Sequence, residues 1–316
     1  MQSTAELPET NLQYAKAIAL SLFCNACWFF SFIYPNEHEV RGFESNLARG
    51  ITFCSLGFVI CRKKEKTLDV KNRKTLINLT IRVTLTSIFA AIAGLSQFYL
   101  PLPIVYTICG SGPIFGFIVD YYLNGIRVNG RQIVGLSVGI IGLVLTVNGN
   151  FLMKWADPSF EVHTEFENYH TTNLLVMFGV ALLLIFGNVL WAVAQVITKT
   201  LTRLDPYQIT FHTGSMLIVN SAVAYCCLGH FKLTMVKLML SVLFVGLPTF
   251  LSIVTGVMSI QMVRKAGVIL IMSYSSIIMG YLMSIFYYHE TQNPICIIGV
   301  VLIVAGVAKT VYEKDP

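Results

Sequence analysis

Charge is scarce in this 316-residue chain, in which Asp, Glu, Lys and Arg together make up 12% of the residues. A soluble domain carries about twice that share of charged residues. Hydrophobic residues make up 55%, and the mean hydropathy is +0.69. This shortage excludes an ordinary soluble domain. It indicates an integral membrane protein whose main solvent is the lipid bilayer.

Catalytic and nucleotide-binding motifs are also missing. The chain contains no G-x4-GK[ST] or HExxH pattern, and no pair of carboxylates lies within its apolar runs. Its one GxSxG match, Gly135–Gly139, lies inside an apolar run and not at the strand-to-helix turn that a nucleophile of this kind requires. The two missing motifs supply the phosphate cradle of ATPases and the metal ligands of metalloproteases. We therefore expect no enzyme activity, no cofactor, no metal and no nucleic-acid partner.

The cysteine pattern does not indicate a disulfide framework either. All eight cysteines lie in or at the edges of apolar runs, and Cys24 and Cys27 form a CxxC pair inside one of them. No second CxxC and no nearby His accompanies that pair, as a metal or redox site would require. We interpret the cysteines as buried free thiols that fill space.

Long hydrophobic runs, in contrast, are abundant. A membrane-spanning helix needs about 20 mostly apolar residues. Ten runs are candidates: Tyr14–Tyr34, Leu47–Cys61, Leu76–Leu100, Pro103–Tyr122, Ile133–Asn150, Asn173–Thr198, Tyr207–Leu228, Leu238–Met262, Ala266–Tyr288 and Pro294–Val311. The polar N-terminal segment lacks the layout of a cleavable signal or transit peptide, so we expect the first run to be retained.

Basic residues are distributed unevenly between the linkers of these spans. The face that holds both termini carries 16 Lys and Arg, seven of them in the linker 62–74. The opposite face carries five, Arg49 among them, and Arg82 lies inside a span. Because cytoplasmic loops are enriched in Lys and Arg, both termini are predicted to be cytoplasmic. Plasma membrane and endomembrane both stay open.

A polar-aromatic pair occurs twice. LFCNACWFF contains Asn25 and Trp28, and IFGNVLWAV contains Asn188 and Trp191. An offset of 163 or 164 residues also aligns five further pairs in order, namely Gln97 with Gln261, Ser111 with Ser275, Gly116 with Gly280, Gly135 with Gly299 and Gly142 with Gly306. This order predicts two five-helix repeats, 1–150 and 173–316, joined by an extracytoplasmic linker, 151–172.

The odd number of spans in each repeat has a topological consequence. After five crossings the chain lies on the other side, so the second repeat must enter the membrane from the opposite face. Inverted repeats related by a pseudo-two-fold axis recur in secondary transporters, whose binding sites lie near the bilayer midplane. The expected fold is therefore all-α, with ten transmembrane helices in two inverted five-helix repeats.

The ends of the two repeats resemble a known family pattern. In the EamA-type repeat a Pro-led helix precedes a Gly-Glu turn and a helix with the spacing G-x6-G. The segment Gly112–Leu145 keeps Pro113, Gly135 and Gly142, but Ile126 stands at the acidic position.

The second segment, Tyr274–Val307, keeps Glu290, Gly299 and Gly306, but Ile277 replaces the proline. The chain thus resembles the drug/metabolite transporter superfamily over nearly its whole length. The stretch RKAGVILIMSYSS is similar to the eukaryotic solute-carrier branch related to nucleotide-sugar transporters. The resemblance implies that the fourth and ninth spans help to line a central cavity.

Polar side chains within the spans are the candidates for substrate binding, because they are costly in a bilayer core and usually face protein or a cavity. Asn25 with Trp28, and Asn188 with Trp191, each lie one helical turn apart on one face. The asparagines are predicted to bind the polar group of a substrate, and the tryptophans its apolar part. Alternatively, these residues join neighbouring helices. Further candidates are Ser111, Tyr274 and Ser275.

Four residues are candidates for gating. Gln97 and Gln261 fall near opposite membrane faces, where each is predicted to act as a gate or, alternatively, to cap a helix end. Pro113 and Pro248 are expected to loosen their helices and free backbone carbonyls.

Two opposite charges lie within neighbouring spans. Arg82 lies about two turns into the third span, and Asp120 about one turn inside the same face of the fourth, by helix geometry. We hypothesise an intramembrane ion pair between them. The alternatives are proton coupling by Asp120, and packing or snorkelling.

Together these features predict a secondary transporter that moves a small organic metabolite by alternating access; a homodimer stays open. The alternative is a non-transporting scaffold or accessory subunit that binds a partner protein, favoured by Ile126 and by the low polarity of the spans. Phosphate-bearing substrates need fixed cations. They are disfavoured because Arg82 is the one deep cation of the predicted spans, although Lys265 lies at the mouth of the ninth.

Overall fold

The computed structural model describes residues 11–38, 40, 42–96, 99–100, 105, 108–110, 112–125, 129–156, 174–228, 234–263, 269, 271–286 and 294–311. Within these ranges the chain is helical and contains no strand. The helices are α1 (Asn11–Glu37), α2 (Gly42–Lys63), α3 (Arg73–Ser96), α5 (Gly112–Asn124), α6 (Gly130–Ala156), α7 (Leu174–Thr198), α8 (Pro206–Leu228), α9 (Met235–Ser241), α10 (Leu247–Met262), α12 (Tyr274–Phe286) and α13 (Pro294–Val311). Each predicted span overlaps at least one of these helices, and parts of several spans, such as 266–268, lie outside the described residues.

Four stretches are long and apolar enough to cross a membrane, namely Leu12–Pro35, Arg73–Ser96, Phe178–Leu201 and Met235–Met262. Three shorter helical stretches are apolar as well. The helices also present large apolar side chains outward, such as Phe178 at 63% exposure and Val301 at 60%. A helix bundle with an apolar exterior of this kind requires an apolar solvent. The chain is therefore a membrane-embedded, all-helical protein.

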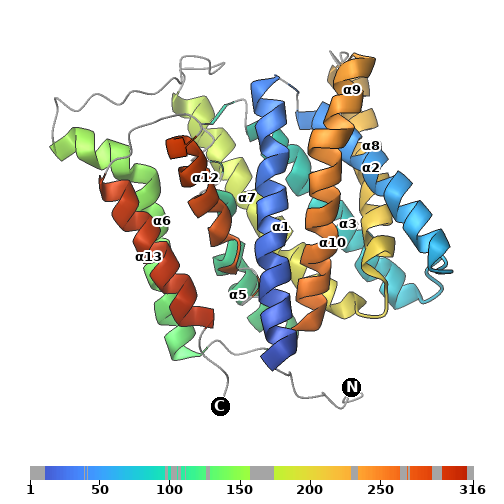
Figure 1. The fold of residues 1–316 in the computed structure, drawn as a ribbon, viewed down its shortest axis with the longest axis horizontal. Coiled ribbons are helices and arrows are strands. Elements are labelled where there is room, and N and C mark those ends of the chain that lie inside the picture. Colours follow the sequence, from blue (N-terminus) through green and yellow to red (C-terminus); the bar gives the residue numbers. More distant parts are fainter. Residues whose placement is uncertain are drawn as a thin grey trace.

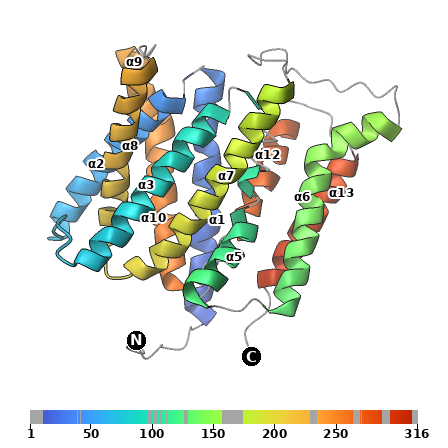
Figure 2. The same ribbon diagram turned by 180° about the vertical axis from the view of Figure 1, so that it is seen from behind.

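The helices pack mainly in four pairs. These are α6 with α13, α2 with α8, α1 with α10, and α3 with α7. Figure 1 shows the α6–α13 pair at one edge of the bundle and the α2–α8 pair at the other. Figure 2, the view from behind, brings α3, α5 and α7 to the front. The bundle therefore has α1 and α10 on one side of its middle and α3 and α7 on the other.

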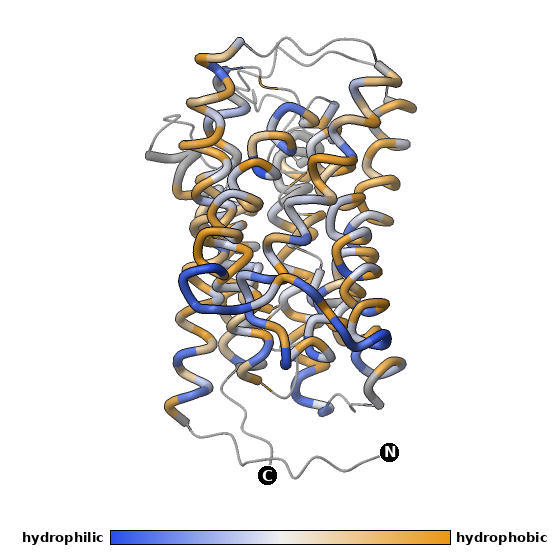
Figure 3. The backbone as a smooth tube through the Cα atoms, turned by 90° about the vertical axis from the view of Figure 1, so that its right-hand side faces the viewer, coloured by the Kyte–Doolittle hydropathy of each residue, from blue (hydrophilic) through white to orange (hydrophobic). Residues whose placement is uncertain are grey.

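The start of α1 and the end of α13 lie at the same end of the bundle (Figures 1 and 2). The hydrophilic linker between α2 and α3 lies toward that end too (Figure 3). Several contacts attach this linker to the start of α8, among them a hydrogen bond from Gln208 Nε2 to the Thr67 carbonyl. His212 Nε2 lies 3.1 Å from the Leu68 carbonyl oxygen, and Lys64 forms a 3.5 Å salt bridge with Asp205. We refer to this as the terminal end of the bundle.

Small residues bring helices into close contact at two crossings. Gly50 of α2 and Gly214 of α8 face each other, because a Cβ built on either residue would lie 3.0 Å from the other's carbonyl oxygen. At the α6–α13 crossing, a Cβ on Gly306 would lie 2.6 Å from the Gly135 carbonyl oxygen. Small residues at such positions let transmembrane backbones approach closely.

The helical stretch Met235–Met262 is interrupted by a π-helical turn, η3 (Val242–Gly246). Proline explains this turn, because Pro248 has no N–H to donate to the carbonyl four residues earlier. The Leu247 N–H instead donates to the Val242 carbonyl, five residues back. Thr249 Oγ1 donates to the Val245 carbonyl at 2.6 Å. The π-helical turn thus ends two residues before Pro248, and the gating role of this proline stays a prediction.

Candidate functional site

A cavity lies in the middle of the bundle, lined by residues of α1, α2, α3, α7, α8, α10 and α12. Its volume is about 100 Å³, counted as the space open to the centre of a water-sized sphere. Both predicted halves of the chain contribute to the lining. A cavity of mixed polar and apolar lining between helices is a common place for a small-molecule site.

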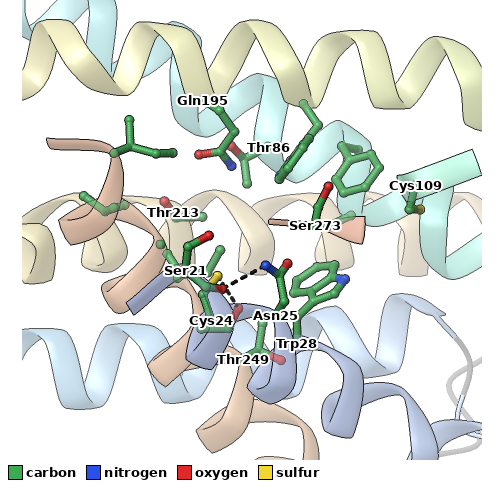
Figure 4. Close-up of a pocket in the computed structure, with 18 of the residues that line it drawn as sticks. Ser21, Cys24, Asn25, Trp28, Thr86, Cys109, Gln195, Thr213, Thr249 and Ser273 are labelled. Atoms are coloured by element: carbon green, nitrogen blue, oxygen red, sulfur yellow. Dashed lines mark hydrogen bonds between the residues drawn. The ribbon is translucent and has the colours of Figure 1, made fainter. Parts of the chain in front are cut away.

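Of the repeated Asn-Trp pairs, three residues line this cavity: Asn25, Trp28 and Trp191. The Asn25 Nδ2 donates within its own helix, to the Ser21 carbonyl at 2.8 Å. Figure 4 shows Asn25 and Trp28 on one side of the cavity and Gln195 with Thr86 on the other. The arrangement fits the predicted binding role of these three residues.

Asn188 differs from its partner in the repeat. It is fully buried and does not line the cavity among the residues described. Its Nδ2 donates to the Ile108 carbonyl at 2.6 Å, just before α5. Asn188 therefore corresponds to the alternative interpretation, a hydrogen bond that joins two helices.

Each tryptophan of the cavity has a distinct neighbour. Trp191 packs against Phe89 of α3, with ring centroids 5.9 Å apart and a 39° angle between the rings. The guanidinium carbon of Arg49 lies 5.5 Å from the centroid of the Trp28 ring. A cation at this distance over an indole is attracted by the π system. The sequence placed Arg49 among the loop cations, whereas α2 begins earlier and buries it in the bundle to 3% exposure.

Arg82 also lines the cavity and is fully buried. Its Nε donates to Thr198 Oγ1 at 3.2 Å and its Nη1 to Thr213 Oγ1 at 2.7 Å, so it links α3 to α7 and α8. Within the described part of the chain, its Nη2 has no hydrogen-bond partner. A buried guanidinium with an unused nitrogen is costly unless a ligand supplies the acceptor.

The hypothesised ion pair between Arg82 and Asp120 is not formed within the described residues. Arg82 points toward α7 and α8, where the two threonine hydroxyls accept its hydrogen bonds. Asp120 is buried on α5, a helix that packs against α7, and it is not among the residues lining the cavity. α3 and α5 are near neighbours along the chain, but they do not bring Arg82 and Asp120 together.

Polar residues outside the predicted set complete the lining. They are Thr86, Thr213, Thr249, Ser252, Ser273 and Ser276, together with Gln195. Gln195 follows Trp191 by one helical turn, so the i, i+4 rule would have found it. Ser273 and Ser276 flank the predicted pair Tyr274 and Ser275 in the sequence.

Tyr274 and Ser275 do not line the cavity among the residues described. Tyr274 is 1% exposed and packs toward α6, where a Cβ on Gly139 would lie 3.1 Å from its ring. The Ser275 hydroxyl donates to the Met272 carbonyl at 2.6 Å. Tyr274 therefore belongs to the hydrophobic core beside the cavity.

The gating candidates have different surroundings. Gln261 Nε2 donates to the Leu201 and Leu204 carbonyls at 3.1 and 3.3 Å, which is the geometry of the predicted cap. Pro113 is buried on α5, and the residues 108–110 that precede this helix are helical as well. Gln97 and Ser111 lie outside the described residues.

Known families and curated proteins give no match to this chain. Solved structures match this chain in their fold. One crystal structure, called only "Crystal structure of protein", has a TM-score of 0.72 and 13% sequence identity. The match covers 93% of this chain and 96% of that chain. The likeness therefore extends over nearly the full length of both chains and concerns the fold.

Proposed function

We propose that this chain is a secondary transporter of the drug/metabolite type that moves a small organic metabolite by alternating access. The single observation that carries the proposal is the central cavity, to which both halves of the chain contribute an indole, Trp28 and Trp191. Aromatic faces beside hydroxyl and amide groups suit a small organic body that carries polar atoms.

The proposal includes ten transmembrane helices in two inverted repeats. The packing pattern supports it, because exchanging equivalent helices of the two halves reproduces the same pairs. The pairs α2–α8 and α6–α13 map onto themselves, α1–α10 maps onto α7–α3, and α5–α7 maps onto α12–α1. Gly50 and Gly214, which face each other, are separated by 164 residues, the offset of the predicted repeat.

The orientation belongs to the same proposal. We place both termini in the cytoplasm, because the terminal end of the bundle also carries the strongly basic linker 62–74. An even number of spans agrees with ends that lie at the same end of the bundle (Figure 1).

Counterflow in liposomes tests transport. Purified protein is reconstituted in vesicles loaded with an unlabelled metabolite, and uptake of the labelled compound is measured across a metabolite panel. We expect uptake that falls about tenfold in Trp28→Ala and in Trp191→Ala, the loss expected from about 1.4 kcal/mol of binding energy.

Two lipid-facing aromatics on the same helices provide matched controls. Phe30 of α1 and Phe186 of α7 are 55% and 57% exposed, and neither lines the cavity. Phe30→Ala and Phe186→Ala are expected to keep uptake within twofold. Unchanged behaviour of both tryptophan variants, together with a partner protein that co-purifies stably, would instead support the scaffold alternative.

A further inference from the structure

We infer that the substrate is a small organic anion, whose carboxylate or phosphate group is bound in the cavity by Arg82 and Arg49. This inference rests on the proposed function, because it names the chemical class that the transport site accepts. It departs from the sequence-based expectation, in which Arg82 was the one deep cation of the predicted spans. The structure adds Arg49 to the cavity.

The surroundings of Arg82 provide the first argument. Among the described residues, its guanidinium donates hydrogen bonds to two neutral hydroxyls, those of Thr198 and Thr213. Neutral partners satisfy hydrogen bonds but do not balance a buried positive charge, which is strongly disfavoured in a low-dielectric interior. The Nη2 nitrogen, without a partner among the described residues, belongs to a side chain that lines the cavity. An oxyanion there would supply both the acceptor and the charge.

The charge balance of the lining gives the second argument. Both charged residues of the described lining are arginines, and none of the described lining residues is Asp or Glu. Arg49 lies over the Trp28 ring, so the second cation belongs to the aromatic wall of the cavity. A cavity with two cations and no lining carboxylate favours anions over neutral compounds and rejects cations.

The positions of the two arginines along the bundle give the third argument. Arg82 follows the start of α3 at Arg73 by nine residues, about 14 Å into the bundle from the terminal end at 1.5 Å per residue. Arg49 follows the start of α2 at Gly42 by seven residues, about 10 Å from the opposite end by the same rise. The two arginines therefore lie nearer to opposite ends of the bundle.

The repeat offset relates these positions. Adding 164 to Arg49 gives Thr213, the residue that accepts a hydrogen bond from Arg82. Adding 164 to Arg82 gives Gly246, which faces Ala48 and Thr52 of α2, the residues on either side of Arg49. The surroundings of Arg82 on α3 and of Arg49 on α2 are thus equivalent under the repeat. The same pair of arginines can bind an anion that enters from either side of the membrane.

Guanidinium groups bind carboxylates and phosphates through the same two-pronged geometry, so the shared ligand chemistry is an oxyanion. The test therefore uses both sources. Thermal unfolding of the purified full-length protein is measured with succinate and its uncharged diamide, with glucose 6-phosphate and glucose, with inorganic phosphate, and with putrescine. We expect at least one organic anion to raise the unfolding midpoint while its uncharged analogue and putrescine do not.

Variants assign that effect to the arginines. Arg49→Gln and Arg82→Gln are each expected to weaken the stabilising anion at least tenfold. Arg82→Lys retains the charge and tests the same site if the glutamine variant does not fold. Arg62→Gln is the matched control, because Arg62 is an exposed residue of α2 outside the cavity lining. Anion stabilisation that is undiminished in both Arg49→Gln and Arg82→Gln overturns the inference, as does a panel in which uncharged analogues stabilise and anions do not.

Counterflow separates this inference from the proposed function. Saturable uptake of an uncharged compound that no anion inhibits overturns the anion inference and supports transport. Arginine-dependent anion binding without any counterflow supports the inference and contradicts transport. Anion uptake accelerated by a valinomycin-imposed potential, positive on the receiving side, supports both.

Discussion

A Cβ atom built on Gly142 would lie 2.6 Å from the carbonyl oxygen of Gly299, so the backbones of α6 and α13 touch at this crossing. In the reverse direction, a Cβ on Gly299 would lie 2.7 Å from the Gly142 carbonyl oxygen and would collide with Thr146 Oγ1. Both glycines come from the two G-x6-G patterns of the sequence. The G-x6-G spacing of each repeat therefore lets α6 and α13, the helices that carry it, pack closely against each other.

The substitution Gly142→Ala is expected to lower the thermal unfolding midpoint. Alanine would favour the helix by about 1 kcal/mol in an open position, but forcing a methyl group against backbone costs about 1–3 kcal/mol in a packed site. The control is Gly179→Ala in α7, where an added Cβ has nothing within 4 Å. Fluorescence-detected unfolding of both variants checks the prediction. A midpoint for Gly142→Ala as high as that of the control would contradict it.

The two repeated asparagines are expected to respond differently to substitution. Asn188→Ala removes the hydrogen bond that the Asn188 side chain donates to the Ile108 carbonyl. We therefore expect the free energy of unfolding to fall by about 1–2 kcal/mol. Asn25→Ala removes a bond within one helix from a cavity-lining residue, so we expect near-normal stability and weaker substrate uptake. Thermal unfolding and counterflow separate the two effects. Equal loss of stability in both variants would show that the structural distinction is wrong.

Apolar runs predicted most of the helices closely, because the outer faces of these helices are themselves apolar. The span predicted as Asn173–Thr198 is the helix Leu174–Thr198, and Tyr207–Leu228 is Pro206–Leu228. The start of α2 was missed by five residues. Its first turns bury Glu44, Asn46 and Arg49 against protein, and hydropathy does not distinguish polar residues that face protein from those that face water.

The site was less predictable than the helices, since it depends on how each helix is rotated. Trp28 and Trp191 were found because the repeat identified them, and both line the cavity. Asn188, from the same pattern, faces the backbone before α5 instead. The role of Arg82 depended on which helices α3 faces, and that information comes from tertiary packing rather than from sequence spacing.

The π-helical turn before Pro248 provides a further test. Pro248→Ala supplies an N–H that can bond the Phe244 carbonyl and restore an α-helical turn, so we expect stability to rise by about 1 kcal/mol. Since π-turns are frequent at functional sites, we also expect slower counterflow. Pro206→Ala is the control, because Pro206 is the first residue of α8, where no helical bond is missing. Counterflow at the wild-type rate in Pro248→Ala would exclude a role for this turn in gating.

The orientation can be tested on the unmodified chain with trypsin. The linker between α2 and α3 contains exposed Lys66 and Lys71, toward the terminal end of the bundle. We expect trypsin to cleave it in inside-out vesicles, whose cytoplasmic face is outward, and to leave it intact in sealed right-side-out vesicles. Lys64 is held by Asp205, so cleavage should favour the two later lysines. In a variant with Lys66→Gln and Lys71→Gln, the fragments that result from cleavage at these two lysines should disappear, which identifies them. Cleavage of this linker in right-side-out vesicles alone would place the terminal end outside the cytoplasm and invert the proposed topology.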